Sequence, residues 1–209
     1  MFLRGCQVVY SGWLPVSHPL FFEEAHVSRI ANFVDGAYLG YILKDEFGLV
    51  KIDYQALANE MAGGLDILRT YYYNCPPFQS STPTQEEKDR FARAQSFFTA
   101  LDRLPRFEVR LGRLAHRGLD ENGQPILMQK RVDIMLGVDL ALLSGKNQIT
   151  HASLLAGDSD FIPAVVAAKS QGVLVRLYHG RKSHKDLWDC VDERFPITKA
   201  FIDGITFAP

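Results

Sequence analysis

Short apolar runs that favour strands alternate along this chain with longer segments that favour helices, and this alternation restricts its fold more than any other feature. We expect strands at residues 30–34, 69–74, 107–111, 152–156 and 173–178. We expect helices at residues 37–47, 53–68, 84–104, 133–143 and 163–171. Strands that alternate with helices form a parallel sheet covered by helices on both faces. The chain is therefore predicted to be an α/β domain with a three-layer, Rossmann-like architecture and a mainly parallel central sheet.

Local signals mark several boundaries of these elements. Thr84 and Glu87 have the spacing of a capping box, and Pro105 ends the helix that follows. Asp53 is expected to cap the start of the second helix. Residues 75–83 are rich in proline, serine and threonine and are predicted to form a loop, and residues 116–125 a connection rich in turns.

Length and composition place limits on the protein. Its 209 residues suffice for one well-buried core, predicted at residues 28–203, with an irregular N-terminal extension at 1–27 and a C-terminal tail at 204–209. No apolar run approaches the roughly 20 residues that span a bilayer, and no signal peptide is recognised. Three scattered cysteines favour a reduced, cytoplasmic setting. A net charge of −1 means that any polyanion must bind a local basic patch.

Aspartates follow two of the predicted strands at the point where each strand ends. Asp35 follows the first strand, and Asp158 and Asp160 follow the strand at 152–156. Ligands bind at the carboxyl ends of the strands in such sheets, so these side chains are expected to lie together. Asp133 opens a helix, and Asp139 lies six residues further on, about 240° around the helix axis, so the two need not share a face.

Converging carboxylates repel one another unless a cation neutralises them, and oxygen ligands alone favour Mg²⁺ or Mn²⁺. The predicted metal ligands are Asp35, Asp133, Asp158, Asp160 and Asp139, and the first four are also the predicted catalytic residues. For any single one of these residues the competing interpretation is a helix cap or turn, and Asp160 in particular has the position of a cap before Pro163.

Basic residues are concentrated near the same sheet edge. They are interpreted as contacts to a phosphodiester backbone, the alternative being a solvated loop. The residues predicted to bind nucleic acid are Lys130, Arg131, Arg176, His179, Arg181 and Lys182.

Four segments together resemble the NYN domain family, which belongs to the PIN-like nucleases. They are Phe33-Val34-Asp35-Gly36, Lys130-Arg131-Val132-Asp133 with Asp139, Ala156-Gly157-Asp158-Ser159-Asp160-Phe161, and Gly172 before an apolar strand. The resemblance covers roughly residues 29–203 and implies a Rossmann-like sheet of the PIN-like type and metal-dependent cleavage of RNA. The family often carries an asparagine shortly after the first Asp-Gly pair, where this chain has Ala37-Tyr38.

The leading prediction is therefore an Mg²⁺- or Mn²⁺-dependent ribonuclease with RNA as its partner and no membrane association. The oligomeric state is left open, a homo-oligomer included. One alternative is a non-catalytic RNA-binding or interaction module on the same fold, motivated by Ala37-Tyr38. Another is a phosphatase similar to the haloacid dehalogenases, in which an Asp-x-Asp pair also follows a strand, although there it follows the first strand.

Overall fold

The protein is built around one six-stranded parallel sheet. It is described here by a computed structural model that covers residues 28–119, 121 and 125–207, so the predicted extension at 1–27 lies outside the described residues. The strand order is β3-β2-β1-β6-β7-β8, and each neighbouring pair is parallel. These strands are β1 (Arg29–Asp35), β2 (Asp66–Asn74), β3 (Phe107–Leu111), β6 (His151–Leu155), β7 (Leu174–His179) and β8 (Glu193–Pro196).

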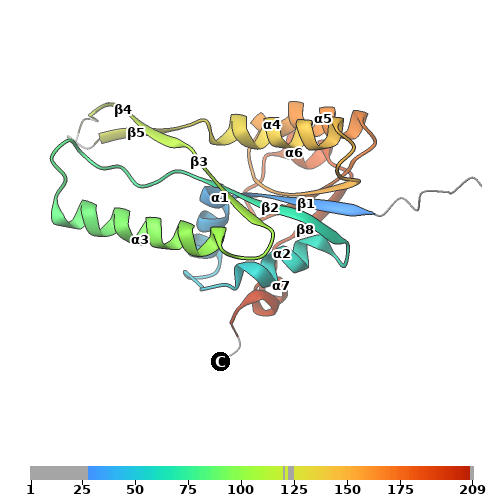
Figure 1. Cartoon of the computed structure of the whole chain (residues 1–209), viewed down its shortest axis with the longest axis horizontal. Coiled ribbons are helices and arrows are strands. Elements are labelled where there is room, and N and C mark those ends of the chain that lie inside the picture. The colour runs from blue at the N-terminus through green and yellow to red at the C-terminus, as the bar shows by residue number, and fades with distance from the viewer. Residues whose placement is uncertain (1–27, 120, 122–124, 208–209) are drawn as a thin grey trace, which may run out of the picture.

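Helices cover both faces of the sheet (Figure 1), which confirms the predicted three-layer α/β fold. One face is covered by α4 (Val132–Gly145), α5 (Ile162–Ser170) and α6 (Lys185–Cys190). The other face is covered by α1 (Gly36–Tyr41), α2 (Tyr54–Ala62), α3 (Gln85–Asp102) and α7 (Lys199–Ile205). Because successive side chains of a strand point to opposite faces, Tyr71 and Tyr73 belong to the first core and Tyr72 to the second.

The strand order changes direction at the centre of the sheet. The chain passes from β1 outward to β2 and β3, and later returns to place β6 on the other side of β1. The carboxyl ends of β1 and β6 therefore flank a topological switch point, which is where open α/β sheets bind their ligands. Asp35 ends β1, and Asp158 comes three residues after the end of β6.

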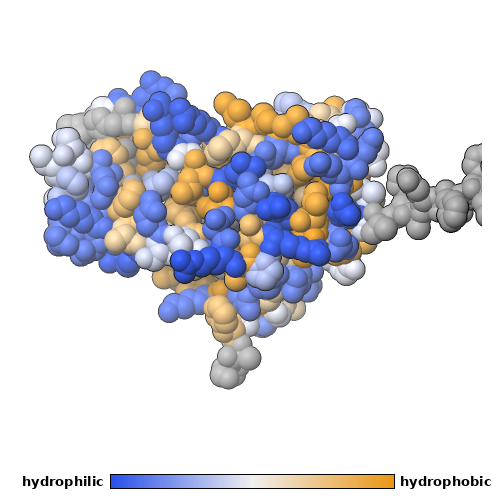
Figure 2. Space-filling model, in the orientation of Figure 1, coloured by the Kyte–Doolittle hydropathy of each residue, from blue (hydrophilic) through white to orange (hydrophobic). Residues whose placement is uncertain are grey.

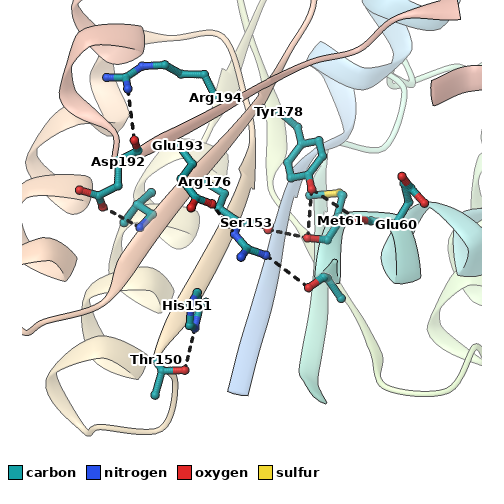
Figure 3. Close-up of polar contacts among 12 residues, drawn as sticks. Glu60, Met61, Thr150, His151, Ser153, Arg176, Tyr178, Asp192, Glu193 and Arg194 are labelled. Carbon is teal, nitrogen blue, oxygen red and sulfur yellow. Dashed lines mark hydrogen bonds and ion pairs between the residues drawn. The ribbon is translucent and has the colours of Figure 1, made fainter. Parts of the chain in front are cut away.

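Side chains of the sheet hold the C-terminal end of α2, whose last carbonyl groups have no partner within the helix (Figure 3). Ser153 Oγ donates to the carbonyl of Met61 at 2.8 Å, and the Tyr178 hydroxyl donates to the same carbonyl at 3.3 Å. Arg176 Nη1 lies 3.4 Å from the carbonyl of Ala62. In this way β6 and β7 fix α2 against the sheet.

The structure corrects the predicted second helix. Asp53 caps it as expected, but α2 ends at Ala62 and not near Leu68. Gly63 and Gly64 both adopt positive φ angles, of 58° and 83°, which terminate a right-handed helix. Strand β2 consequently begins at Asp66, three residues before the predicted start.

Two other segments differ from prediction. The expected helix at 37–47 changes after Tyr41 into a π-helical turn, η1 (Ile42–Glu46). Where a connection rich in turns was predicted, residues 116–119 belong to β4 (Arg113–Leu119) and Pro125 begins β5 (Pro125–Lys130), an antiparallel pair that forms a second, two-stranded sheet. No helix among the described residues is long and apolar enough to cross a membrane.

The shared carbonyl of Met61 gives a test of how α2 is held. Ser153→Ala and Tyr178→Phe should each lower the free energy of unfolding by about 1 kcal/mol, because each leaves the carbonyl one donor. The double variant leaves this buried carbonyl without either donor, so its loss should exceed the sum of the single losses by about 1 kcal/mol. Urea unfolding of the four proteins measures this; simple additivity would show that the two donors act independently.

Candidate active site

Asp35 and Asp158 are both held by the turns that they cap. Asp35 Oδ1 accepts the backbone N–H groups of Ala37 and Tyr38, at 2.9 and 3.2 Å, at the start of α1. Asp158 Oδ1 accepts the N–H of Asp160 at 3.1 Å, at the start of the short 3₁₀ helix η2 (Ser159–Phe161). Capping uses Oδ1 in both cases, so it fixes each carboxylate in place without engaging Oδ2.

Asp133 and Asp160 complete a group of four neighbouring carboxylates. Burial raises the pKa of the Asp35 carboxyl, the two capping N–H groups oppose this, and the charges of Asp133 and Asp158 raise it further. Partial burial also raises the pKa of Asp133, followed by the charges of Asp158 and Asp160. Asp160 does not cap the helix before Pro163, since the capping side chain of η2 is that of Asp158 and the side chain of Phe161 makes no cap hydrogen bond to α5. The four carboxylates thus repel one another at the switch point.

This acidic cluster has no cationic partner in the described part of the chain. None of the ion pairs there involves Asp35, Asp133, Asp158 or Asp160. Nor do any three His, Cys, Asp or Glu side chains within the described ranges lie close enough together to hold a metal ion between them. Mg²⁺ usually keeps several waters and takes only one or two carboxylates, so a partial shell of uncompensated carboxylates fits such an ion.

Two recesses open on either side of the acidic cluster. The first, which we call the hairpin groove, has a volume of about 920 Å³ and is lined by Asp133, Ser159 and Asp160, by the basic residues Arg113, Lys130 and Arg131, and by apolar side chains of β5, α4 and α5. Ile134 and Val138 of α4 are largely exposed there, and Figure 2 shows hydrophobic surface over this part of the molecule. The second, the tyrosine pocket, has a volume of about 400 Å³ and is lined by Asp35, Tyr38, Tyr41, Gly157, Asp158, Lys182 and His184.

Three of the six predicted nucleic-acid contacts line a recess beside the acidic cluster, and the other three line neither recess. Lys130 and Arg131 line the hairpin groove, and Lys182 lines the tyrosine pocket, so these three flank the acidic cluster. His179 ends β7, and the exposed Arg181 follows in the same loop as Lys182.

Arg176 is not at the sheet edge, which corrects the prediction. It lies in the middle of β7, pairs with Glu193 at 2.8 Å and reaches the carbonyl of Ala62 (Figure 3). Its guanidinium group therefore binds Glu193 of β8 and the last residue of α2.

Asp139 is placed apart from the other aspartates. Its Oδ2 accepts a hydrogen bond from the Tyr73 hydroxyl at 2.9 Å and lies 3.5 Å from Arg110 Nε. Burial raises the pKa of Tyr73 well above its usual value, and the charge of Asp139 adds to the shift. These contacts join α4 to β2 and β3, as the angle between Asp133 and Asp139 around the helix allows.

Tyr38 is the functional candidate that the sequence reasoning overlooked. Its hydroxyl donates to the carbonyl of Lys182 at 2.8 Å and accepts the N–H of Gly180 at 3.1 Å, while its ring covers Gly157, where a Cβ would lie 2.4 Å from the ring. Burial raises the pKa of Tyr38 to about 12, so the hydroxyl keeps its proton. Tyr38 thus joins the turn after β1 to the segments that follow β6 and β7. The available signal was its position three residues after Asp35, in the first turn of a helix at the sheet edge.

The contact between Tyr38 and Gly157 can be tested by adding one methyl group. Gly157→Ala should lower the free energy of unfolding by about 2 kcal/mol, because the ring must move. The same change combined with Tyr38→Leu should be better tolerated. Gly137→Ala is the control. Gly137 lies inside α4, and a Cβ added there would lie 3.5 Å from the Cβ of Ala164, an ordinary contact distance, so this change should be neutral or stabilising. Thermal unfolding measures all of these, and equal effects of the two glycine changes would contradict the contact.

Comparisons with known proteins agree with this architecture. No curated protein matches the chain. The crystal structure of a protein of unknown function from Vibrio parahaemolyticus is similar over 86% of this chain and 99% of its own, with a TM-score of 0.56 and 20% sequence identity, which supports the fold alone. The model of the NYN domain matches residues 29–198, which is most of the chain. The chain therefore belongs to the NYN domain family of PIN-like nucleases.

Proposed function

We propose that this protein is a ribonuclease that hydrolyses RNA phosphodiester bonds with the help of Mg²⁺ or Mn²⁺. The observation that supports this most is the cluster of Asp35, Asp133, Asp158 and Asp160, which lies at the switch point of a nuclease fold and has no cationic partner among the described residues. A cluster of carboxylates that costs electrostatic free energy is expected at a site that binds a cation.

The residues divide into two roles. Asp35 and Asp158 would hold the ion with Oδ2, because Oδ1 of each is fixed by backbone N–H groups. Asp133 and Asp160 have no side-chain partner within the described ranges, and would hold the waters of the ion or accept the proton of the attacking water. A bound Mg²⁺ or Mn²⁺ would supply Lewis-acid polarisation of the phosphate and a lower pKa for the attacking water.

RNA is the proposed substrate because cations flank the carboxylates. Lys130 and Arg131 on one side, and Lys182 on the other, would bind phosphates next to the one attacked. The alternative phosphatase similar to haloacid dehalogenases loses support, because Asp158 and Asp160 follow β6 and the chain belongs to another family. A binding module without turnover is the outcome that would remain if RNA bound but was not cleaved.

Removal of one negative charge tests the proposal without removing the cap. Asp158→Asn keeps an oxygen that can accept the N–H of Asp160, so the turn should fold normally. Cleavage of labelled single-stranded and structured RNA in Mn²⁺ or Mg²⁺ should fall by at least about a hundredfold, and EDTA should abolish cleavage by the wild type. Mn²⁺ affinity, measured by titration calorimetry, should fall as well.

Asp203→Asn is the matched control, because Asp203 is an exposed carboxylate on α7 that pairs with Lys199. This variant should cleave RNA and bind Mn²⁺ like the wild type. Cleavage that persists in EDTA, or that survives in Asp158→Asn, would refute the proposed site. Retention of RNA on a gel without cleavage in either metal would instead favour the binding module.

A further inference from the structure

We propose that the tyrosine pocket is a nucleotide subsite, in which an unpaired base stacks on Tyr41 and an adjoining phosphate binds Lys182. This inference rests on the proposed function, because it concerns how the RNA strand enters the acidic cluster. It adds a base contact at Tyr41 of α1 to the phosphate contact already proposed for Lys182.

The segment at 180–184 that forms one wall of this pocket is fixed by its backbone. The Tyr38 hydroxyl bonds to Gly180 N and to the carbonyl of Lys182, and His184 N donates to the carbonyl of Gly157 at 2.9 Å. Arg181 N donates to Glu46 Oε1 at 2.9 Å. A basic loop that only contacted solvent would not need these four anchors. They connect the segment both to α1 and η1 and to the turn that carries Asp158, so its cations are held beside the acidic cluster.

Tyr41 is placed as a stacking platform. It lies one helical turn after Tyr38 on the same face of α1, with the two ring centroids 6.5 Å apart and the planes inclined by 18°. Lys182 Nζ lies 5.1 Å from the centroid of the Tyr41 ring. This ammonium group also hydrogen-bonds the Tyr41 side chain and has no ion pair within the described ranges, so a phosphate can compete with Tyr41 for it. A base can then occupy the ring face while the phosphate of the same nucleotide neutralises the lysine.

The position of the pocket matches the path of a polynucleotide. Asp35 and Asp158 line the tyrosine pocket, while Asp133 and Asp160 line the hairpin groove, so the acidic cluster lies between the two recesses. A strand that crosses the cluster would have phosphates near Lys130 and Arg131 before it and near Lys182 after it. Only the tyrosine pocket offers an aromatic face on this path, since the described lining of the hairpin groove is aliphatic and polar.

A binding experiment separates the base contact from the phosphate contact. The probes are a fluorescein-labelled uridine octamer and an abasic octamer with the same phosphates, measured by anisotropy in Ca²⁺ with the strands verified as intact. Tyr41→Leu should weaken binding of the uridine strand by roughly 5- to 100-fold and leave the abasic strand unchanged. Lys182→Gln should weaken both strands equally and reduce the salt dependence of log Kd by about 0.7, the value for one phosphate contact on a single strand.

The matched controls are Trp188→Leu and Lys199→Gln. Trp188 is an exposed aromatic ring and Lys199 is an exposed lysine that pairs with Asp203, and neither residue lines either recess. Both variants should bind the two octamers like the wild type.

Photocrosslinking of a 4-thiouridine octamer to the wild type gives a second measurement that needs no variant, and the crosslink should map to Tyr41. An unchanged Kd in Tyr41→Leu, an equal loss for the abasic strand, or crosslinks confined to Trp188 would overturn the subsite while leaving cleavage by the wild type unaffected. A wild type that binds neither strand would overturn the subsite together with the RNA substrate.

Discussion

The parallel pairing of β1 with β6 is the interaction on which the candidate active site depends. These two strands come from opposite halves of the chain, and their register places Val34 beside Leu155. Phe33 and Leu154 are completely buried in this pairing, so hydrophobic burial maintains a contact that local sequence could not. Because the strands are parallel, their carboxyl ends coincide, and the turns that bear Asp35 and Asp158 are brought together. Any slip of this register would separate the two carboxylates.

The same aspartates serve the local structure and the site. Asp35 and Asp158 each satisfy backbone N–H groups at the start of a helical turn through Oδ1, which is the ordinary role of an aspartate in that position. A serine or an asparagine would cap the turn equally well, but neither would contribute a negative charge. A role as a cap and the proposed role as a metal ligand are therefore compatible, since the cap fixes the orientation of the carboxylate that is proposed to bind the ion.

The sequence was sufficient to predict the layers, five of the six strands of the main sheet and the carboxylates that follow β1 and β6, because these follow from apolar periodicity and from the residues that come after each strand. It did not predict β8 or the β4–β5 hairpin. It was insufficient where a contact between segments far apart in the sequence determines what a side chain binds. Arg176 lies within the strand predicted at 173–178, three residues before the end of β7, yet it was also assigned to the edge; its pairing with Glu193 shows that its side chain is used within the sheet. Asp139 accepts a hydrogen bond from Tyr73, and Tyr38 bonds to a segment some 140 residues further along, so the partners of these two residues cannot be predicted from the sequence around them. The predicted end of α2 was wrong because Gly63 and Gly64 take positive φ angles that stop the helix at Ala62.

Repulsion within the acidic cluster requires that the stability of the fold come from elsewhere. The two cores on either face of the sheet supply it, and Val132 and Phe161, which adjoin Asp133 and Asp160, are buried in the first of them. No ion pair in the described part of the chain involves these two carboxylates. Compensation by internal ion pairs would have stabilised the fold, but it would also have occupied the oxygens. The cations are placed instead at the rims, where Lys130 and Lys182 line the adjoining recesses without pairing with the carboxylates. A chain with a net charge of −1 can in this way keep one strongly acidic point between two basic ones, an arrangement that suits a metal ion at the centre and a polyanion across it.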